Sequence, residues 1–355
     1  MWKYVLKRLG LLFITTFIIL SLTYILLQCL PVEVPRGSDT AIFEFYQTQV
    51  SLGYYKRIDE SMGNLYQQYV ADVLQSDYKF QLTSGKYVFY VQLPIMTRYF
   101  NWLKNIVTKW DWGTSTQISI GATAISIIMR QLPVSMKLNI IAMFISVPCG
   151  IGLGIWAALK KNKLTDHIIS TLVMVFISVP SFVLISFLLI WLAYGTGWVS
   201  YQWPSVSQAQ NWVVSLKGYI IPVTALCFGS IASFARYTRA ELCEVMSSEF
   251  LLLARTKGLT RAQAVVKHAL RNSMVPIVPM IISEFVGILS GSMILEQLYG
   301  IPGIGQLFVN ALTAKDYSVV MVDMAIYTVI GLLATLVIDL SYGIVDPRIR
   351  MGASK

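Results

Sequence analysis

The side chains that most often carry out chemistry are few and scattered in this sequence. Its four cysteines, Cys29, Cys149, Cys227 and Cys243, show no C-x-x-C spacing, and its two histidines form no H-E-x-x-H motif. This spacing indicates neither a metal cluster nor a disulfide framework. The nucleotide-binding pattern G-x-x-x-x-G-K-[ST] does not occur either. We therefore predict that the chain is not an enzyme and carries no cofactor or ATP site of its own.

One carboxylate stands out by its surroundings. Glu284 lies well inside a long apolar run, where a charge is costly unless it is paired, protonated or in contact with water. Glu284, and Ser290 on the same run, are therefore candidates for a translocation pathway. The alternative is that Glu284 is a structural partner of a polar side chain on another helix. The nearby Gly287 and Gly291 form a G-x-x-x-G pattern, which favours close helix packing.

A second group of residues indicates a unit that contacts a partner or a surface rather than a catalytic site. Residues Glu249 to Lys257 can form a short helix with Phe250, Leu253 and Ala254 on one face. Gly258 then supplies a residue that tolerates the left-handed backbone after a helix end.

A second short helix is predicted directly after this glycine. Thr260 and Gln263 have the spacing of a capping box, in which the two side chains satisfy each other's backbone N–H groups. The apolar face of this helix is predicted to contain Ala262, Val265, Val266, Ala269 and Leu270. A helix–glycine–helix unit of this kind fits either a groove on a partner protein or the surface of an anionic membrane.

The elements that must position these residues are membrane helices. Of 355 residues, 55% are hydrophobic and only 13% are charged, with a mean hydropathy of +0.62. A net charge of +10 can indicate nucleic acid, but in so apolar a chain it is better explained by membrane orientation, so no nucleic-acid partner is expected. Six apolar runs are long enough to span a membrane. They are 9–30, 138–159, 168–194, 219–234, 275–295 and 319–345.

The distribution of Lys and Arg predicts the orientation. Three basic residues precede the first run, three lie between the second and third, and seven lie between the fourth and fifth. The short loops on the opposite side hold only Lys217 and Lys315. Because basic loops stay in the cytoplasm, both termini are predicted to be cytoplasmic in a multi-pass protein of the cell membrane.

These runs divide the chain into five parts. We expect a cytoplasmic N-terminus at 1–8, a first transmembrane helix at 9–30 and an external domain at 31–131. Residues 132–347 form the core with the remaining five helices and a cytoplasmic loop at 235–274, and 348–355 form a cytoplasmic tail. Strand-like runs such as 87–91 predict a small mixed external domain, and Trp102, Trp110 and Trp112 predict its seam with the membrane.

Several motifs, in order, resemble one family. Residues 249–259 (EFLLLARTKGL) and 267–272 (KHALRN) resemble the cytoplasmic coupling loop of binding-protein-dependent ABC importer permeases, in the form typical of the dipeptide, oligopeptide and nickel branch. Residues 111–115 (DWGTS), 130–133 (RQLP), 296–305 (EQLYGIPGIG) and 346–348 (DPR) resemble further elements of that branch. The sequence departs from the general permease pattern at 252–254, which reads L-L-A in place of E-A-A.

The resemblance implies an all-α membrane protein with the six-helix fold of type I ABC importer permeases and a small mixed external domain between helices 1 and 2. It implies a second permease subunit, two ATP-binding subunits that hold ATP and Mg²⁺, and an external substrate-binding protein or lipoprotein. Peptides are the expected cargo. Membrane lipid is expected to surround the helices. The expected ATPase-coupling residues are Glu249, Ala254, Arg255, Lys257, Gly258 and Leu259, and the expected external gate contains Glu296, Pro302, Gly303 and Gly305.

Alternatives stay open at this point. Nickel chelates, glutathione or other small solutes are possible cargoes of the same class. An ATP-independent secondary transporter would show paired inverted repeats, and none is visible. A membrane enzyme or sensor would need a nucleophile–base pair that the sequence does not reveal.

Overall fold

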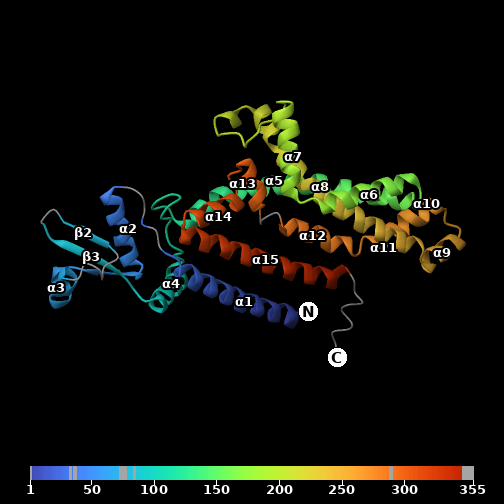
Figure 1. Cartoon of the computed structure of the whole chain (residues 1–355). Coiled ribbons are helices and arrows are strands. Elements are labelled where there is room, and N and C mark those ends of the chain that lie inside the picture. Colours follow the sequence, from blue (N-terminus) through green and yellow to red (C-terminus); the bar gives the residue numbers. More distant parts are fainter. Residues whose placement is uncertain are drawn as a thin grey trace. The chain divides into compact units, whose positions relative to one another are not determined.

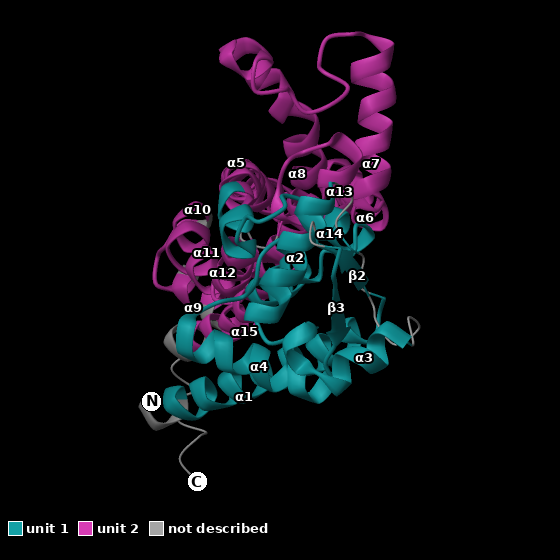
Figure 2. Cartoon of the chain, turned by 90° about the vertical axis from the view of Figure 1, so that its left-hand side faces the viewer, with its two compact units in different colours: residues 1–130, 307–328 teal, residues 131–306, 329–355 magenta. Residues whose placement is uncertain are grey.

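The structure is a computed structural model that describes residues 2–31, 34, 38–71, 78–82, 85–287 and 291–345 (Figure 1). The chain divides into two compact units (Figure 2). Unit 1 consists of residues 1–130 and 307–328, and unit 2 consists of residues 131–306 and 329–355. Each unit is described by itself below.

Unit 1 combines a long apolar helix with a small mixed domain. Helix α1 (Trp2–Gln28) begins before the predicted first span at Leu9. The elements of the mixed domain are α2 (Asp39–Ser51), β1 (Tyr55–Ile58), η1 (Glu60–Met62), α3 (Asn64–Ala71), β2 (Tyr78–Gln81), β3 (Tyr87–Gln92) and α4 (Ile95–Lys109). The strand predicted at 87–91 is present as β3, the centre of an antiparallel sheet in the order β1-β3-β2.

Both faces of this sheet are covered, because successive side chains of a strand point in opposite directions. Tyr90 of β3 stacks on Tyr46 of α2, with ring centroids 4.9 Å apart. Phe89 points to the opposite face and lies 5.8 Å from Tyr66 of α3. Tyr46, Phe89 and Tyr90 are each almost fully buried, so this domain has a core of its own.

Helix α4 joins the mixed domain to α1. Trp102 stacks on Tyr24 of α1 at 4.6 Å, and the Tyr99 and Ser21 hydroxyls are 2.9 Å apart. Trp102 and Trp110 each lie edge-on to Trp112, at 6.3 and 5.7 Å. The three tryptophans therefore form one aromatic group next to the end of α1.

Unit 2 is almost entirely helical. Its elements are α5 (Ala124–Leu159), α6 (Leu164–Ser178), α7 (Ser181–Leu188), the π-helical turn η3 (Leu189–Gly195), η4 (Gln208–Gln210), α8 (Trp212–Met246), α9 (Glu249–Thr256), α10 (Arg261–Ala264), η5 (Val265–Ala269), α11 (Leu270–Ser273), α12 (Ile277–Gly287) and α13 (Met293–Tyr299). Helices α14 (Ile304–Thr313) and α15 (Tyr317–Val345) are each divided between the two units. The first residues of α5, up to Arg130, belong to unit 1.

Two glycines let α5 and α8 approach closely. A Cβ atom at Gly150 would lie 2.6 Å from Cβ of Phe234, and one at Gly154 would lie 2.6 Å from Cβ of Thr238. A side chain at either position would force the backbones apart. The G-x-x-x-G pair that packs helices is thus 150/154. The prediction that Gly287 and Gly291 do so was wrong, because Gly291 has a φ of +63° and is not helical.

Four helices are long and apolar enough to cross a membrane: α1, α5, α8 and α15. Two bent pairs also qualify if each counts as one span, so the described residues hold up to six. Helix α8 runs continuously through Pro222 and far beyond the predicted span at 219–234. The predicted fold class, an all-α membrane protein with a small mixed domain between the first two spans, is confirmed.

The predicted spans at 168–194 and 275–295 are not single helices. The first is broken before Pro180 by a bend of 99°, because the residue before a proline is driven out of the helical conformation, and Val179 has a ψ of 117°. In the second, α12 ends at Gly287 and a new helix starts at Met293. A bend of 53° also separates α12 from the helical segment before it.

Candidate functional site

The helix–glycine–helix unit predicted between the fourth and fifth spans is present. Helix α8 continues to Met246, so the loop is shorter than the predicted 235–274. Helix α9 follows, and Gly258 then has a φ of +94°, with open space where a side chain would begin. The predicted capping box is confirmed: Gln263 N donates to Thr260 Oγ1 at 3.3 Å, and Thr260 N donates to Gln263 Oε1 at 3.1 Å.

Helix α9 rests on its own chain through one leucine and leaves two others exposed. Leu251 is buried in a cluster with Ala158, Leu242, Cys243, Ala264, Val265 and Ala269. Leu252 and Leu253 are 65% and 57% exposed. The apolar face that Phe250, Leu253 and Ala254 were predicted to offer to a partner groove or a membrane surface is therefore not the face that packs within the chain. Leu253 points away from the cluster, Ala254 is half-buried, and the Phe250 side chain lies outside the described residues.

The predicted face of the second helix is also split. Val265 and Ala269 are buried as expected, whereas Ala262 and Val266 are exposed. Residues 265–269 form a π-helical turn, which inserts an extra residue and shifts the phase of every later side chain. A regular period of 3.6 residues could not anticipate this shift.

The remaining predicted coupling residues differ in their exposure. Glu249 and Lys257 are exposed, and Leu259 is half-buried against the cluster around Leu251. The Arg255 side chain lies outside the described residues. A groove of about 660 Å³ runs beside α9, lined by Lys161, Lys163, Glu249 and apolar side chains of α5, α8 and α10. The loop thus presents a leucine pair and a charged rim on a packed base.

Three of the four predicted external-gate residues, Glu296, Gly303 and Gly305, gather around one buried carboxylate. Glu296 is 1% exposed. Its Oε1 accepts hydrogen bonds from Ser135 Oγ at 2.7 Å and Ser292 N at 3.3 Å, and its Oε2 accepts one from Gln306 N at 3.1 Å. Ser135 Oγ in turn accepts from Ile304 N at 3.0 Å. The carboxylate therefore anchors the segment 301–306 to α13 and α5.

Two of the predicted glycines are explained by this anchor. A side chain at Gly303 would collide with Ser135 Oγ and the Glu296 carboxylate. A Cβ at Gly305 would lie 2.8 Å from the backbone N of Met293. Pro302 is exposed, so its side chain lies outside this buried anchor. Ser135 is a member of this site that the sequence did not reveal, and only its position after the R-Q-L-P motif hinted at it.

Of the two predicted pathway residues, Glu284 lies in the described part of the chain. Ser230 Oγ on α8 donates to Glu284 Oε1 on α12 at 2.5 Å, and Glu284 is half-buried. Ser290 lies outside the described residues. The hydrogen bond supplies the structural partner that the alternative interpretation required, and the side chain is only partly buried.

Two further charged groups were missed. Asp316 Oδ2 accepts hydrogen bonds from Ser115 Oγ at 2.5 Å and from the backbone N of Thr116, Gln117 and Ile118 at 3.0–3.1 Å. These bonds tie the D-x-G-x-S motif to the segment before α15.

Arg239 of α8 forms a two-pronged ion pair with Asp166 of α6, at 2.5 and 2.8 Å. The charge pattern places Arg239 in a loop, and its partner is too distant in sequence to be found by pattern.

Comparison with known proteins agrees with this architecture. Residues 150–351, more than half of the chain, match the family described as "Binding-protein-dependent transport system inner membrane component". The chain is 34% identical over 352 residues to the dipeptide transport system permease protein DppB of Lactococcus lactis subsp. cremoris, an alignment that covers 99% of this chain and 100% of the relative. It is 36% identical over 264 residues to the oligopeptide transport system permease protein OppB of Escherichia coli K12, covering 72% of this chain and 81% of the relative.

A crystal structure of an amino acid ABC transporter superposes with a TM-score of 0.46 at 21% identity, covering 61% of this chain and 94% of that one. The family match and the full-length relative together establish the general function. The chain belongs to the inner-membrane components of binding-protein-dependent transport systems, and it is a multi-pass permease of the ABC importer class.

Proposed function

We propose that this permease imports short peptides across the cell membrane, together with a second permease subunit. An external binding protein or lipoprotein delivers the peptide, and two cytoplasmic subunits bind ATP and Mg²⁺ and hydrolyse the ATP. Both termini face the cytoplasm, since the basic residues concentrate on that side. The names of the similar DppB and OppB proteins support peptides as the cargo class.

The observation that carries this proposal is the loop between α8 and α12. Leu251 holds α9 firmly on its own chain, while Leu252 and Leu253 face outward. Exposed leucines cost free energy unless a partner covers them, and a short amphipathic helix is suited to a groove on another protein. When the ATPase subunits close, a force on α9 is transmitted through the cluster around Leu251 to the ends of α5 and α8, which alternates access between the two sides.

The proposal is tested by reconstitution. The chain is expressed with its neighbouring transporter genes, purified through a tag on this chain, and placed in liposomes with the binding protein outside. We expect a second permease and two ATPase chains to co-purify, and ATP-dependent uptake of labelled di- to pentapeptides. Uptake by this chain alone without ATP would overturn the proposal, as would a complete complex that takes up no peptide.

We also propose that Glu284 lines the pathway. Glu284→Gln keeps the shape and removes the charge, so we expect peptide uptake to fall about tenfold while the amount of folded complex stays unchanged. Ser230→Ala is the matched control, because it removes only the hydrogen bond to the same carboxylate. Equal losses of thermal stability in both variants, with normal uptake in Glu284→Gln, would show a structural role instead. Uptake rates and thermal unfolding are measured in parallel.

A further inference from the structure

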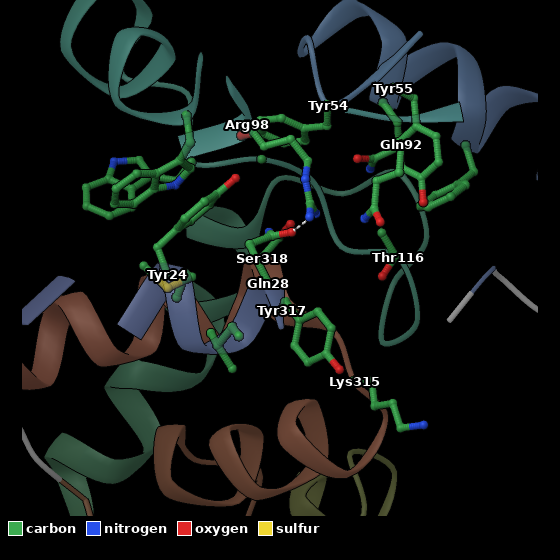
Figure 3. A pocket seen from close by; sticks show the side chains of 17 residues that line it. Tyr24, Gln28, Tyr54, Tyr55, Gln92, Arg98, Thr116, Lys315, Tyr317 and Ser318 are labelled. Carbon is green, nitrogen blue, oxygen red and sulfur yellow. Dashed lines mark hydrogen bonds between the residues drawn. The ribbon is translucent and has the colours of Figure 1, made fainter. Parts of the chain in front are cut away.

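A small pocket lies wholly within unit 1, where α1, α4 and the segment after α14 meet the mixed domain (Figure 3). Its volume is about 60 Å³, room for a small polar group. Tyr24 and Gln28 of α1, Arg98 of α4 and Thr116 enter it from different parts of the chain, as Figure 3 shows. Among the described residues, the lining contains two basic side chains, Arg98 and Lys315, and no acidic one.

Arg98 is the unusual member of this lining. It is only 4% exposed, and its Nη1 donates to Gln28 Oε1. Its Nε has no hydrogen-bond partner, and no carboxylate within the described part of the chain forms an ion pair with it. A buried guanidinium without a counter-charge is costly, because it has lost its water and gained no anion in return.

A second unpaired donor lies in the same pocket. Trp112 Nε1 is buried and makes no hydrogen bond to any described residue. Tyr54 also lines the pocket, and burial together with the nearby charge of Asp111 raises the pKa of its hydroxyl well above the usual value. Tyr54 therefore remains a neutral group that can donate a hydrogen bond, and it brings no negative charge to Arg98.

We propose that this pocket binds a carboxylate. The free Nε edge of Arg98 offers the side-on fork that holds a carboxylate with two parallel hydrogen bonds, and Trp112 Nε1 supplies a third donor. Aromatic rings of Tyr24, Trp102 and Trp112 surround the site and suit an apolar group next to the carboxylate. The inference rests on the proposed function for the external placement of this unit.

Two sources can supply this carboxylate in a binding-protein-dependent importer. One is the free C-terminus of the peptide cargo, and the other is an acidic side chain of the delivering protein. Both present the same chemical group to Arg98, so the site is defined by the group and the source is decided by experiment.

The site is tested on the complete transporter in lipid nanodiscs, without ATP. The probes are N-acetyl-phenylalanine and its amide, which differ in the carboxylate alone, and binding is measured by equilibrium dialysis. We expect the acid to bind at least tenfold more tightly than the amide. Arg98→Gln should abolish this difference, and Trp112→Phe, which retains an aromatic ring, should reduce it about threefold.

Lys104→Gln is the matched control, since it removes one positive charge from the exposed side of the same helix. It should bind both probes as the wild type does. Equal binding of acid and amide by the wild type would overturn the proposal, as would an unchanged preference in Trp112→Phe and Arg98→Gln. Inorganic phosphate that displaces the acid at equal concentration would overturn the choice of carboxylate.

Two further measurements identify the source. If the cargo supplies the carboxylate, Arg98→Gln loses the preference for a free over an amidated dipeptide in uptake, while the affinity for the binding protein is unchanged. If the binding protein supplies it, the same variant binds cargo-free binding protein at least tenfold more weakly. If Arg98→Gln showed neither effect, a role of this pocket in transport would be overturned. Probe binding is measured without uptake, so a failure of the carboxylate site is distinguishable from a failure of the proposed peptide transport. Peptide uptake by the Lys104→Gln control tests the transport function separately.

Discussion

Replacement of Gly258 by proline is expected to abolish cargo-stimulated ATP hydrolysis in the assembled transporter, while the complex remains folded in the membrane. Gly258 has a φ of +94°, and proline is locked near −65°, so the turn between α9 and α10 cannot form. The direction of α9, and with it the outward position of Leu252 and Leu253, would change. ATP hydrolysis is measured with and without loaded binding protein, and assembly by co-purification of the ATPase subunits.

Two variants separate the turn from simple backbone strain. Gly85 also has a positive φ, of +80°, and has open space around it, but it lies in the mixed domain. Gly85→Pro should leave stimulated hydrolysis intact. Ala254→Asp, which puts a charge at a half-buried position of α9, should abolish stimulation as Gly258→Pro does. Normal stimulation in both loop variants would contradict a docking role and favour a loop that lies on lipid.

The second large effect is expected at Glu296. Its removal by Glu296→Ala leaves the Ser135 hydroxyl and the backbone N of Ser292 and Gln306 without their acceptor inside a closed site. Each buried group left unpaired costs about 1–3 kcal/mol, so the apparent Tm should fall by about 5–10 °C. Peptide uptake should fall as well, because residues 301–306 lose their anchor. Both are measured on the purified complex.

The controls for this experiment differ in what they leave behind. Glu296→Gln retains one acceptor oxygen but turns an amide donor toward other donors, so an intermediate loss is expected. Glu244→Ala removes a carboxylate from an exposed position of α8 and should change neither property. If Glu296→Ala unfolds at the wild-type temperature, the anchor does not stabilise the loop as its hydrogen bonds indicate.

Local features of the coupling loop could be predicted, since each depends on neighbouring residues. The capping box of Thr260 and Gln263 needs only a spacing of three, and the turn at Gly258 needs only a residue that tolerates a positive φ. Which faces of the two helices are buried could not be predicted with the same accuracy. They depend on the packing of Leu251 against α5 and α8 and on the π-helical turn at 265–269.

Pairs that are distant in sequence left weaker signals. The Glu296 site was approached through its P-G-x-G motif, yet its serine partner, Ser135, lies 161 positions earlier. Asp316 and Ser115 are 201 positions apart, and neither suggests the other. Nothing in the sequence marks Arg98 among the basic residues between the first two spans, since its partner Gln28 lies 70 positions earlier.

The sequence by itself therefore determined what depends on composition and short spacing: a membrane protein with up to six spans, the helix–glycine–helix loop, and membership of an importer family. Tertiary structure decided which groups meet. It placed the close helix contact at Gly150 and Gly154 rather than at Gly287 and Gly291, and it buried Arg98 without a counter-charge among the described residues. The physical reason is that apolar periodicity sets which residues leave water, whereas the partner of a buried polar group is set by helices that pack only once the chain has folded.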